Sequence, residues 1–187
     1  DATIHLAEGI YREEVLLTGK SVIGDATIIV LGNESDPSTV RVSGADEAAP
    51  TEPVRTYGFN VVAQTRLAVR GIRFEYTKKD WQEGFYERGE KRGAGLYIDQ
   101  GSNISVAFCQ FMNNDNGLWA DNGSFVIAEN IECGSGTTGS YPRGVQVETS
   151  SRAILRDSSI HNMHWGVGVG ILSNAQISGC TVGNNTG

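Results

Sequence analysis

The chain has 187 residues, of which 39% are hydrophobic, and this composition excludes an intrinsically disordered protein. The 24 glycines follow no three-residue period, which excludes collagen, and no apolar run approaches the roughly 18–20 residues of a membrane span. The net charge of −7 argues against nucleic acid and anionic membranes as partners, so we expect neither nucleic-acid binding nor membrane insertion.

Short segments near the N-terminus alternate apolar with other residues, as half-buried strands do. Turn sequences rich in Gly, Asn and Pro separate these segments. Because both ends of the chain fall within such periodic sequence, we expect a fragment of a longer protein. The pattern predicts strands at residues 3–6, 14–17, 21–23, 27–30 and 39–42.

Two patterns then alternate along the rest of the chain. The first, Gly-apolar-any-apolar, begins at Gly95, Gly117, Gly144 and Gly166, in steps of 22, 27 and 22 residues. The second pairs two apolar residues four or five positions apart: Val69 with Phe74, Val106 with Phe111, Ile127 with Ile131, Leu155 with Ile160, and Ile177 with Val182. A period near 22 residues with two or three short strands predicts an all-β, single-stranded right-handed parallel β-helix, whose coils stack to bury their inner faces.

We expect one β-helix domain over residues 1–187 with a long inserted loop at 76–92, because Gly58 and Gly95 lie about 15 residues farther apart than one coil. Turn asparagines recur at Asn113, Asn162 and Asn184, with Cys133 at the equivalent place in the middle coil. Asn tolerates the left-handed backbone conformation and bonds locally, which favours these positions as corners of the coils.

Residues 3–13 read Thr-Ile-His-Leu-Ala-Glu-Gly-Ile-Tyr-Arg-Glu, and this opening resembles the first coil of pectin-lyase-like β-helices, including pectin methylesterases. The continuation is similar to the start of β-helix regions in phage and prophage tail proteins; it comprises residues 15–24, 31–33, 36–38 and 40–42. This resemblance implies a homotrimeric tailspike or tail fibre in the virion tail that binds host cell-surface polysaccharide and can depolymerise it.

The esterase activity itself is excluded by the residues at its expected site. Pectin methylesterases carry Gln-Asp-Thr-Leu-Tyr where this chain has 114–119, so that only Asp115 remains. Their Gly-Thr-Val-Asp-Phe-Ile-Phe-Gly segment is absent, and residues 132–136 stand in its place. The second acidic residue of the esterase pair is therefore missing.

Strand alternation predicts which side chains point out of the solenoid. If Leu96 and Ile98 point inward, Tyr97 and Asp99 point outward. Stacked strands lie about 4.8 Å apart, so equivalent residues of successive coils should form rows. We expect a carboxylate row of Asp99, Asp121 and Glu148 with a catalytic role, and beside it the substrate-binding residues Tyr97, Trp119 and Gln146.

Carboxylates beside aromatic rings suit a glycan, because an aromatic face stacks on the apolar side of a sugar. Glycoside hydrolysis uses two carboxyl groups about 5–5.5 Å apart for retention or about 6.5–9.5 Å apart for inversion. A lyase would instead bind Ca²⁺ through the same carboxylates; otherwise we expect no cofactor and no metal site. Trp81 and Tyr86, in the inserted loop, are further candidates for substrate binding.

Three functions therefore remain open. The first is a phage tailspike or tail-fibre domain that binds host polysaccharide, with or without cleavage. The second is a secreted, extracellular bacterial polysaccharide lyase or glycoside hydrolase of the same fold. The third is a purely structural virion or surface module, in which the carboxylate row is inert.

Overall fold

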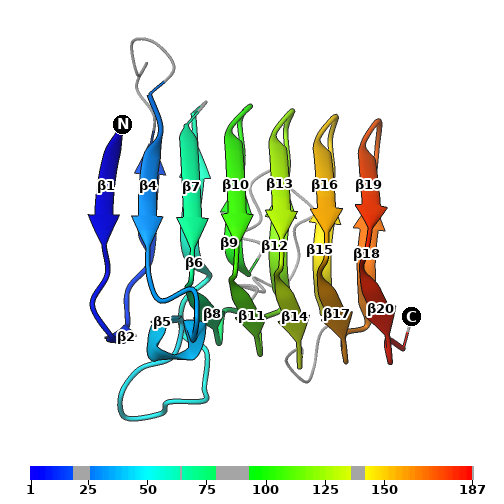
Figure 1. Cartoon of the computed structure of the whole chain (residues 1–187). Coiled ribbons are helices and arrows are strands. Elements are labelled where there is room, and N and C mark those ends of the chain that lie inside the picture. The colour runs from blue at the N-terminus through cyan, green and yellow to red at the C-terminus, as the bar shows by residue number, and fades with distance from the viewer. Residues whose placement is uncertain (19–25, 64, 79–92, 136–141, 187) are drawn as a thin grey trace, which may run out of the picture.

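The computed structural model describes residues 1–18, 26–63, 65–78, 93–135 and 142–186 and confirms the predicted parallel β-helix. Its coils stack side by side, and the two termini lie at opposite ends of the solenoid (Figure 1). A complete coil contributes one strand to each of three parallel sheets, which we name A, B and C. A 3₁₀ helix, η1 (Pro37–Thr39), begins after Asp36, whose side chain accepts a hydrogen bond from the Ser38 backbone N–H.

The described strands follow chain order within each sheet. Sheet A contains β1 (Ala2–His5), β4 (Ile28–Leu31), β7 (Arg66–Arg70), β10 (Asn103–Ala107), β13 (Phe125–Glu129), β16 (Arg152–Arg156) and β19 (Asn174–Ser178). Sheet B contains β2 (Gly9–Tyr11), β5 (Val40–Ser43), β8 (Arg73–Glu75), β11 (Gln110–Met112), β14 (Glu132–Gly134), β17 (Ser159–His161) and β20 (Thr181–Gly183). Sheet C contains β3 (Val15–Thr18), β6 (Tyr57–Val62), β9 (Ala94–Ile98), β12 (Asn116–Ala120), β15 (Arg143–Val147) and β18 (Trp165–Val169).

The core consists of side-chain columns that run along the solenoid axis. In sheet C the strand register pairs Leu118 with Leu96 on one side and with Val145 on the other, and all three side chains are fully buried. The predicted interior column is therefore confirmed. In sheet B the rings of Phe74 and Phe111 stack with their centroids 5.2 Å apart.

The repeat glycine of each coil is required by close packing between coils. A Cβ atom built on Gly117 would lie 2.5 Å from the carbonyl oxygen of Gly144, and one on Gly144 would lie 2.6 Å from that of Gly166. The same contact recurs at Gly58 and Gly95. Any larger residue would push neighbouring coils apart, which is why the glycine marks the period in the sequence.

In the middle coil the apolar pair Ile127 and Ile131 is out of register with the apolar pairs of the neighbouring coils. Ala128 and Cys133 pair in register with Val106 and Phe111 in the interior columns, whereas Ile127 is half-buried and Ile131, 2% exposed, enters the core directly before β14. Ala and Cys are small, so an apolar pattern that favours large residues passes over them. Cys133 therefore lies in the core and not at a turn.

The predicted turn asparagines do adopt the left-handed conformation, with φ of 56° at Asn113, 54° at Asn162 and 55° at Asn184. Ser135, with φ of 53°, takes the equivalent position in the middle coil. In the coil of Asn113, the side-chain hydrogen bonds to the preceding coil come from the next residue, Asn114. The buried Asn114 side chain accepts hydrogen bonds from the Thr77 backbone N–H and hydroxyl, each at 3.0 Å, and donates to the Phe74 carbonyl at 2.9 Å.

The N-terminal region contains one strand, β2, that the alternation did not predict. The strand expected at 21–23 and residues 79–92 of the expected insertion lie outside the described residues.

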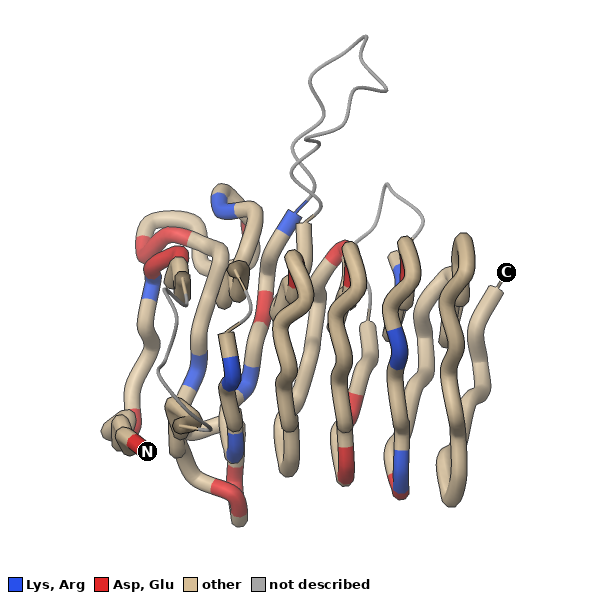
Figure 2. The backbone as a smooth tube through the Cα atoms, turned by 90° about the horizontal axis from the view of Figure 1, so that it is seen from above, with Lys and Arg blue, Asp and Glu red and all other residues tan. Residues whose placement is uncertain are grey.

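Acidic and basic positions are interspersed along the coils, whereas the chain beyond Asp157 carries none (Figure 2). No helix in the described part of the chain has the length and hydropathy that a membrane span requires.

Candidate functional site

The structure brings the predicted site residues together on the outer face of sheet C. Tyr97, Trp119 and Gln146 are partners in register on β9, β12 and β15. The predicted carboxylates come directly after these strands and continue the inter-coil bonding: the backbone N–H groups of Asp99, Asp121 and Glu148 donate to the carbonyl oxygens of Val61, Ile98 and Ala120, at 2.8, 2.8 and 2.9 Å. Two parallel rows of side chains therefore cross successive coils.

A continuous stack of flat side chains runs along this outer face, and we call it the aromatic row. Tyr57 stacks on Tyr97 with centroids 5.1 Å apart, and Tyr97 meets Trp119 edge to face at 6.5 Å. The guanidinium carbon of Arg143 lies 5.6 Å from the centroid of Trp119 and 4.5 Å from that of Trp165. A cation between two indole rings is attracted by both, so Arg143 joins the two Trp residues into one unit.

Hydrogen bonds hold each carboxylate of the second row. The Asp99 carboxylate accepts from the Asn122 side-chain amide at 2.7 Å, and the Asp121 carboxylate accepts from the Tyr97 hydroxyl at 3.5 Å. Glu148 accepts from the Gln146 amide at 2.7 Å and lies 3.7 Å from the Arg143 guanidinium. The carboxylate row is thus oriented by neighbours on the same face.

Exposure divides the face into a covered part and an open part. Trp119 is 6% exposed and Asp121 is 4% exposed, whereas Trp165 is 40% exposed. Tyr97 and Glu148 are half-buried. Trp165 is therefore the most exposed member of the aromatic row, and Arg143 connects it to the covered Trp119.

Sequence reasoning missed Tyr57 and Trp165 and did not place Arg143 on this face. Each stands directly before a repeat glycine, at Gly58, Gly144 and Gly166, and points outward. The alternation was applied only to residues after the glycine. In three of the five coils that carry the repeat glycine an aromatic or cationic residue stands at this position, and that recurrence was the missing signal; Ala94 and Asn116 stand there in the other two.

The remaining predicted residues are placed as follows. Trp81 and Tyr86 lie outside the described residues, so their binding role stays a prediction. In the described ranges no group of three or more His, Cys, Asp or Glu side chains is placed to hold a metal ion. His161 is half-buried and contacts Glu132, with Nε2 3.1 Å from the carboxylate oxygen.

Comparison with known proteins bears on the family alone. The family model described as "right handed beta helix region" matches residues 78–187, more than half of the chain. No curated protein and no solved structure matches the chain in the other comparisons. The stacked coils, the glycine column and this match agree, and the chain belongs to the right-handed β-helix family.

Proposed function

We propose that this chain is the β-helix domain of a phage tailspike or tail fibre that binds host cell-surface polysaccharide through the outer face of sheet C. The observation that carries the proposal is the aromatic row, which ends at the half-exposed Trp165 and is flanked by oriented carboxylates. Aromatic rings stack on the apolar faces of sugars, and carboxylates accept hydrogen bonds from sugar hydroxyls.

A rigid platform suits a long, flexible polymer. Hydrogen bonds from coil to coil and the Arg143 stack hold the row before any ligand arrives, so little side-chain entropy is lost on binding. In this proposal the chain works in the virion tail as a homotrimer. Light scattering on the purified domain tests the oligomer: three chain masses support it, and a monomer contradicts it.

The binding experiment uses an array of bacterial O-antigen and capsular polysaccharides. Trp165→Ala should weaken binding at least about tenfold, because stacking on an exposed aromatic ring is lost. Val169→Ala is the matched control, since Val169 is also exposed on β18 but lies outside the aromatic row. Absence of binding by the unmodified domain, or equal binding by Trp165→Ala, would refute the proposed surface.

Cleavage of the bound polysaccharide is a second candidate function, favoured by the stacking of Asp99 and Asp121 in adjacent coils. A spacing of about 4.8 Å between coils approaches the separation of a retaining pair, and two coils, from Asp99 to Glu148, approach that of an inverting pair. Burial of Asp121 beside the Tyr97 hydroxyl gives it an environment different from that of Asp99.

An assay of released reducing ends, on each polysaccharide that the domain binds, tests this activity. The ultraviolet absorbance of unsaturated products distinguishes a lyase from a hydrolase. Asp121→Asn should abolish release while binding persists, and Glu47→Gln, an exposed carboxylate on another part of the surface, should leave it unchanged. A Ca²⁺ requirement with unsaturated products in a monomeric, secreted protein would favour the lyase alternative. If the unmodified domain binds polysaccharide without releasing reducing ends, the domain is a binding module. If it neither binds nor cleaves polysaccharide, the domain is a structural module.

A further inference from the structure

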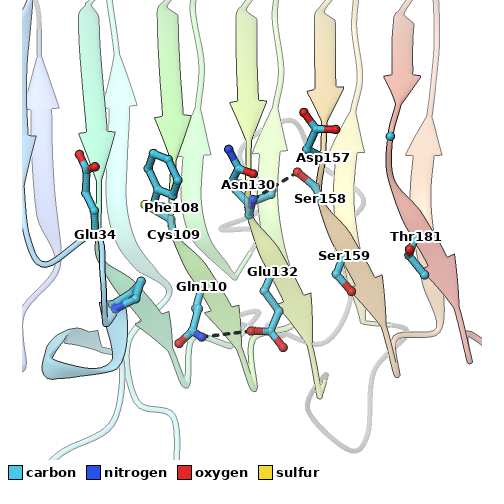
Figure 3. A pocket seen from close by; sticks show the side chains of 13 residues that line it. Glu34, Phe108, Cys109, Gln110, Asn130, Glu132, Asp157, Ser158, Ser159 and Thr181 are labelled. Carbon is cyan, nitrogen blue, oxygen red and sulfur yellow. Dashed lines mark hydrogen bonds between the residues drawn. The ribbon is translucent and has the colours of Figure 1, made fainter.

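A polar groove lies at the corner where sheet A passes into sheet B, on a part of the surface distinct from sheet C. Its volume is about 440 Å³, within the range of ligand sites. Figure 3 shows side chains from several successive coils around it. The lining includes Phe108, Gln110, Asn130, Glu132, Asp157 and Ser159.

Several of these side chains have hydrogen-bonding capacity that the protein does not use. The Gln110 amide donates to Glu132 at 3.1 Å, and its buried carbonyl oxygen Oε1 has no hydrogen-bond partner in the described part of the chain. Among the described residues no hydrogen bond or ion pair engages the Asn130 amide or the Asp157 carboxylate. A buried acceptor without a partner is unfavourable unless a ligand or water satisfies it.

The corner backbone adds an aromatic surface to this polar lining. In five successive coils the corner residue has positive φ, and four of these residues, Gly71, Asn130, Asp157 and Gly179, are of types that tolerate it. Phe108, with φ of 53°, is the exception. Its ring lines the groove and lies 5.3 Å from the guanidinium carbon of Arg70, which is itself bound to Glu34.

The charges of the groove select among ligands. Glu34 is neutralised by Arg70, whereas Asp157 carries a carboxylate with no counter-ion among the described residues. Both Glu132 oxygens are occupied, one by Gln110 and the other by His161. An acidic sugar would be repelled, and a cation would find few unoccupied carboxylate oxygens. Hydroxyl groups can donate to Asp157 and Gln110 and accept from Asn130.

We propose that this groove is a second glycan-binding site that takes an uncharged segment of a polysaccharide, with Phe108 beneath a sugar ring and Gln110, Asn130 and Asp157 bonding its hydroxyls. The class of ligand rests on the function proposed above, whereas the location does not. Two sites on separate faces of one solenoid would let the domain hold one polysaccharide chain at two places or two chains at once, which raises avidity.

The test uses the same polysaccharide array, with neutral polymers compared against uronic-acid polymers, and isothermal titration on the neutral polymers that bind. Ser159→Leu fills the groove, and Gln110→Ala removes the buried acceptor. Ser105→Leu and Gln176→Ala are matched controls, because both residues are exposed on the outer face of sheet A. Each groove variant should weaken binding of neutral polymers about fivefold or more, and the controls should not change it.

The outcomes separate this inference from the proposed function. If Trp165→Ala weakens binding and both groove variants bind like the unmodified domain, the groove is not a glycan site although sheet C is. If Ser159→Leu changes the mass in light scattering, the groove is an interface between copies of the chain, which overturns the inference. If the unmodified domain binds no polysaccharide, both proposals fall. Unchanged thermal unfolding of the variants shows that the fold is intact.

Discussion

The guanidinium carbon of Arg143 lies 4.5 Å from the centre of the Trp165 ring, although 22 residues separate the two in the chain. They are register partners on β15 and β18, so the strand pairing of adjacent coils creates the contact. The same guanidinium lies over Trp119 in the coil on the other side. Arg143 therefore connects the covered and the open parts of the aromatic row.

Replacing Arg143 by Lys should destabilise the domain by about 1 kcal/mol and shift its tryptophan fluorescence. A lysine ammonium keeps the charge but lacks the planar group that stacks on two rings. Urea unfolding and the emission spectrum measure the two effects. Arg156→Lys is the control, because the Arg156 side chain forms an exposed ion pair with Glu129. Equal spectra and equal stability for Arg143→Lys would show that the stack is not formed.

Replacing Gly117 by Ala should lower the free energy of unfolding by about 2–3 kcal/mol, because the added methyl group overlaps the Gly144 carbonyl oxygen. Thermal and urea unfolding measure this loss. Gly183→Ala is the matched control within a strand, since a Cβ there meets nothing within 4 Å. The control should stay within about 0.5 kcal/mol of the unmodified domain. Similar losses in both variants would contradict the close approach of the coils.

Replacing Asn114 by Ala should cost about 2–3 kcal/mol, because it leaves the buried Thr77 N–H and Phe74 carbonyl without their partner. Hydrogen exchange at Thr77 should accelerate at the same time, since its amide loses the bond that protects it. Asn174→Ala, at an exposed position on β19, should change neither quantity. A stable Asn114→Ala variant with slow exchange at Thr77 would show that this bond between coils is dispensable.

Stability should fall as the pH rises above about 9. Burial raises the pKa of the Cys109 thiol from 9.0 to about 12 and also raises the pKa of the Cys133 thiol. Between pH 9 and 12 the unfolded chain loses the Cys109 proton while the folded chain keeps it, so ionisation favours unfolding by up to about 1.4 kcal/mol per pH unit.

Urea unfolding at pH 8, 9 and 10 measures this slope. Cys109→Ala should reduce the slope by about half, because the buried Cys133 thiol still contributes. Val106→Ala, a core variant that removes no thiol, should keep the slope while lowering stability throughout. A thiol reagent at neutral pH gives a second measurement. The half-buried Cys180 should react with it in the folded domain, and Cys109 and Cys133 should react only after unfolding. Equal slopes for both variants would contradict the burial of the Cys109 thiol.

The sequence by itself determined the solenoid and most of its interior. Short-range alternation and a 22-residue period follow from packing, because each coil must present a row of apolar side chains and a glycine at the close contact. The shared column of Leu96, Leu118 and Val145 could therefore be predicted. The middle coil could not, since Ala128 and Cys133 are too small to stand out, and only hydrogen-bonded register identifies them as inward.

Only the tertiary structure decided what stands on the outer surfaces. Outward side chains follow no packing period. Which of them form a binding surface therefore depends on the residues that lie beside them in the neighbouring coils. Arg143 carries no signal until Trp119 and Trp165 are seen on either side of it. The corner groove likewise arises where sheet A turns into sheet B, and the unused acceptor of Gln110 becomes visible only when burial and hydrogen bonding are known together. Burial sets a repeating pattern along the chain, whereas a binding surface is set by which coils lie beside each other.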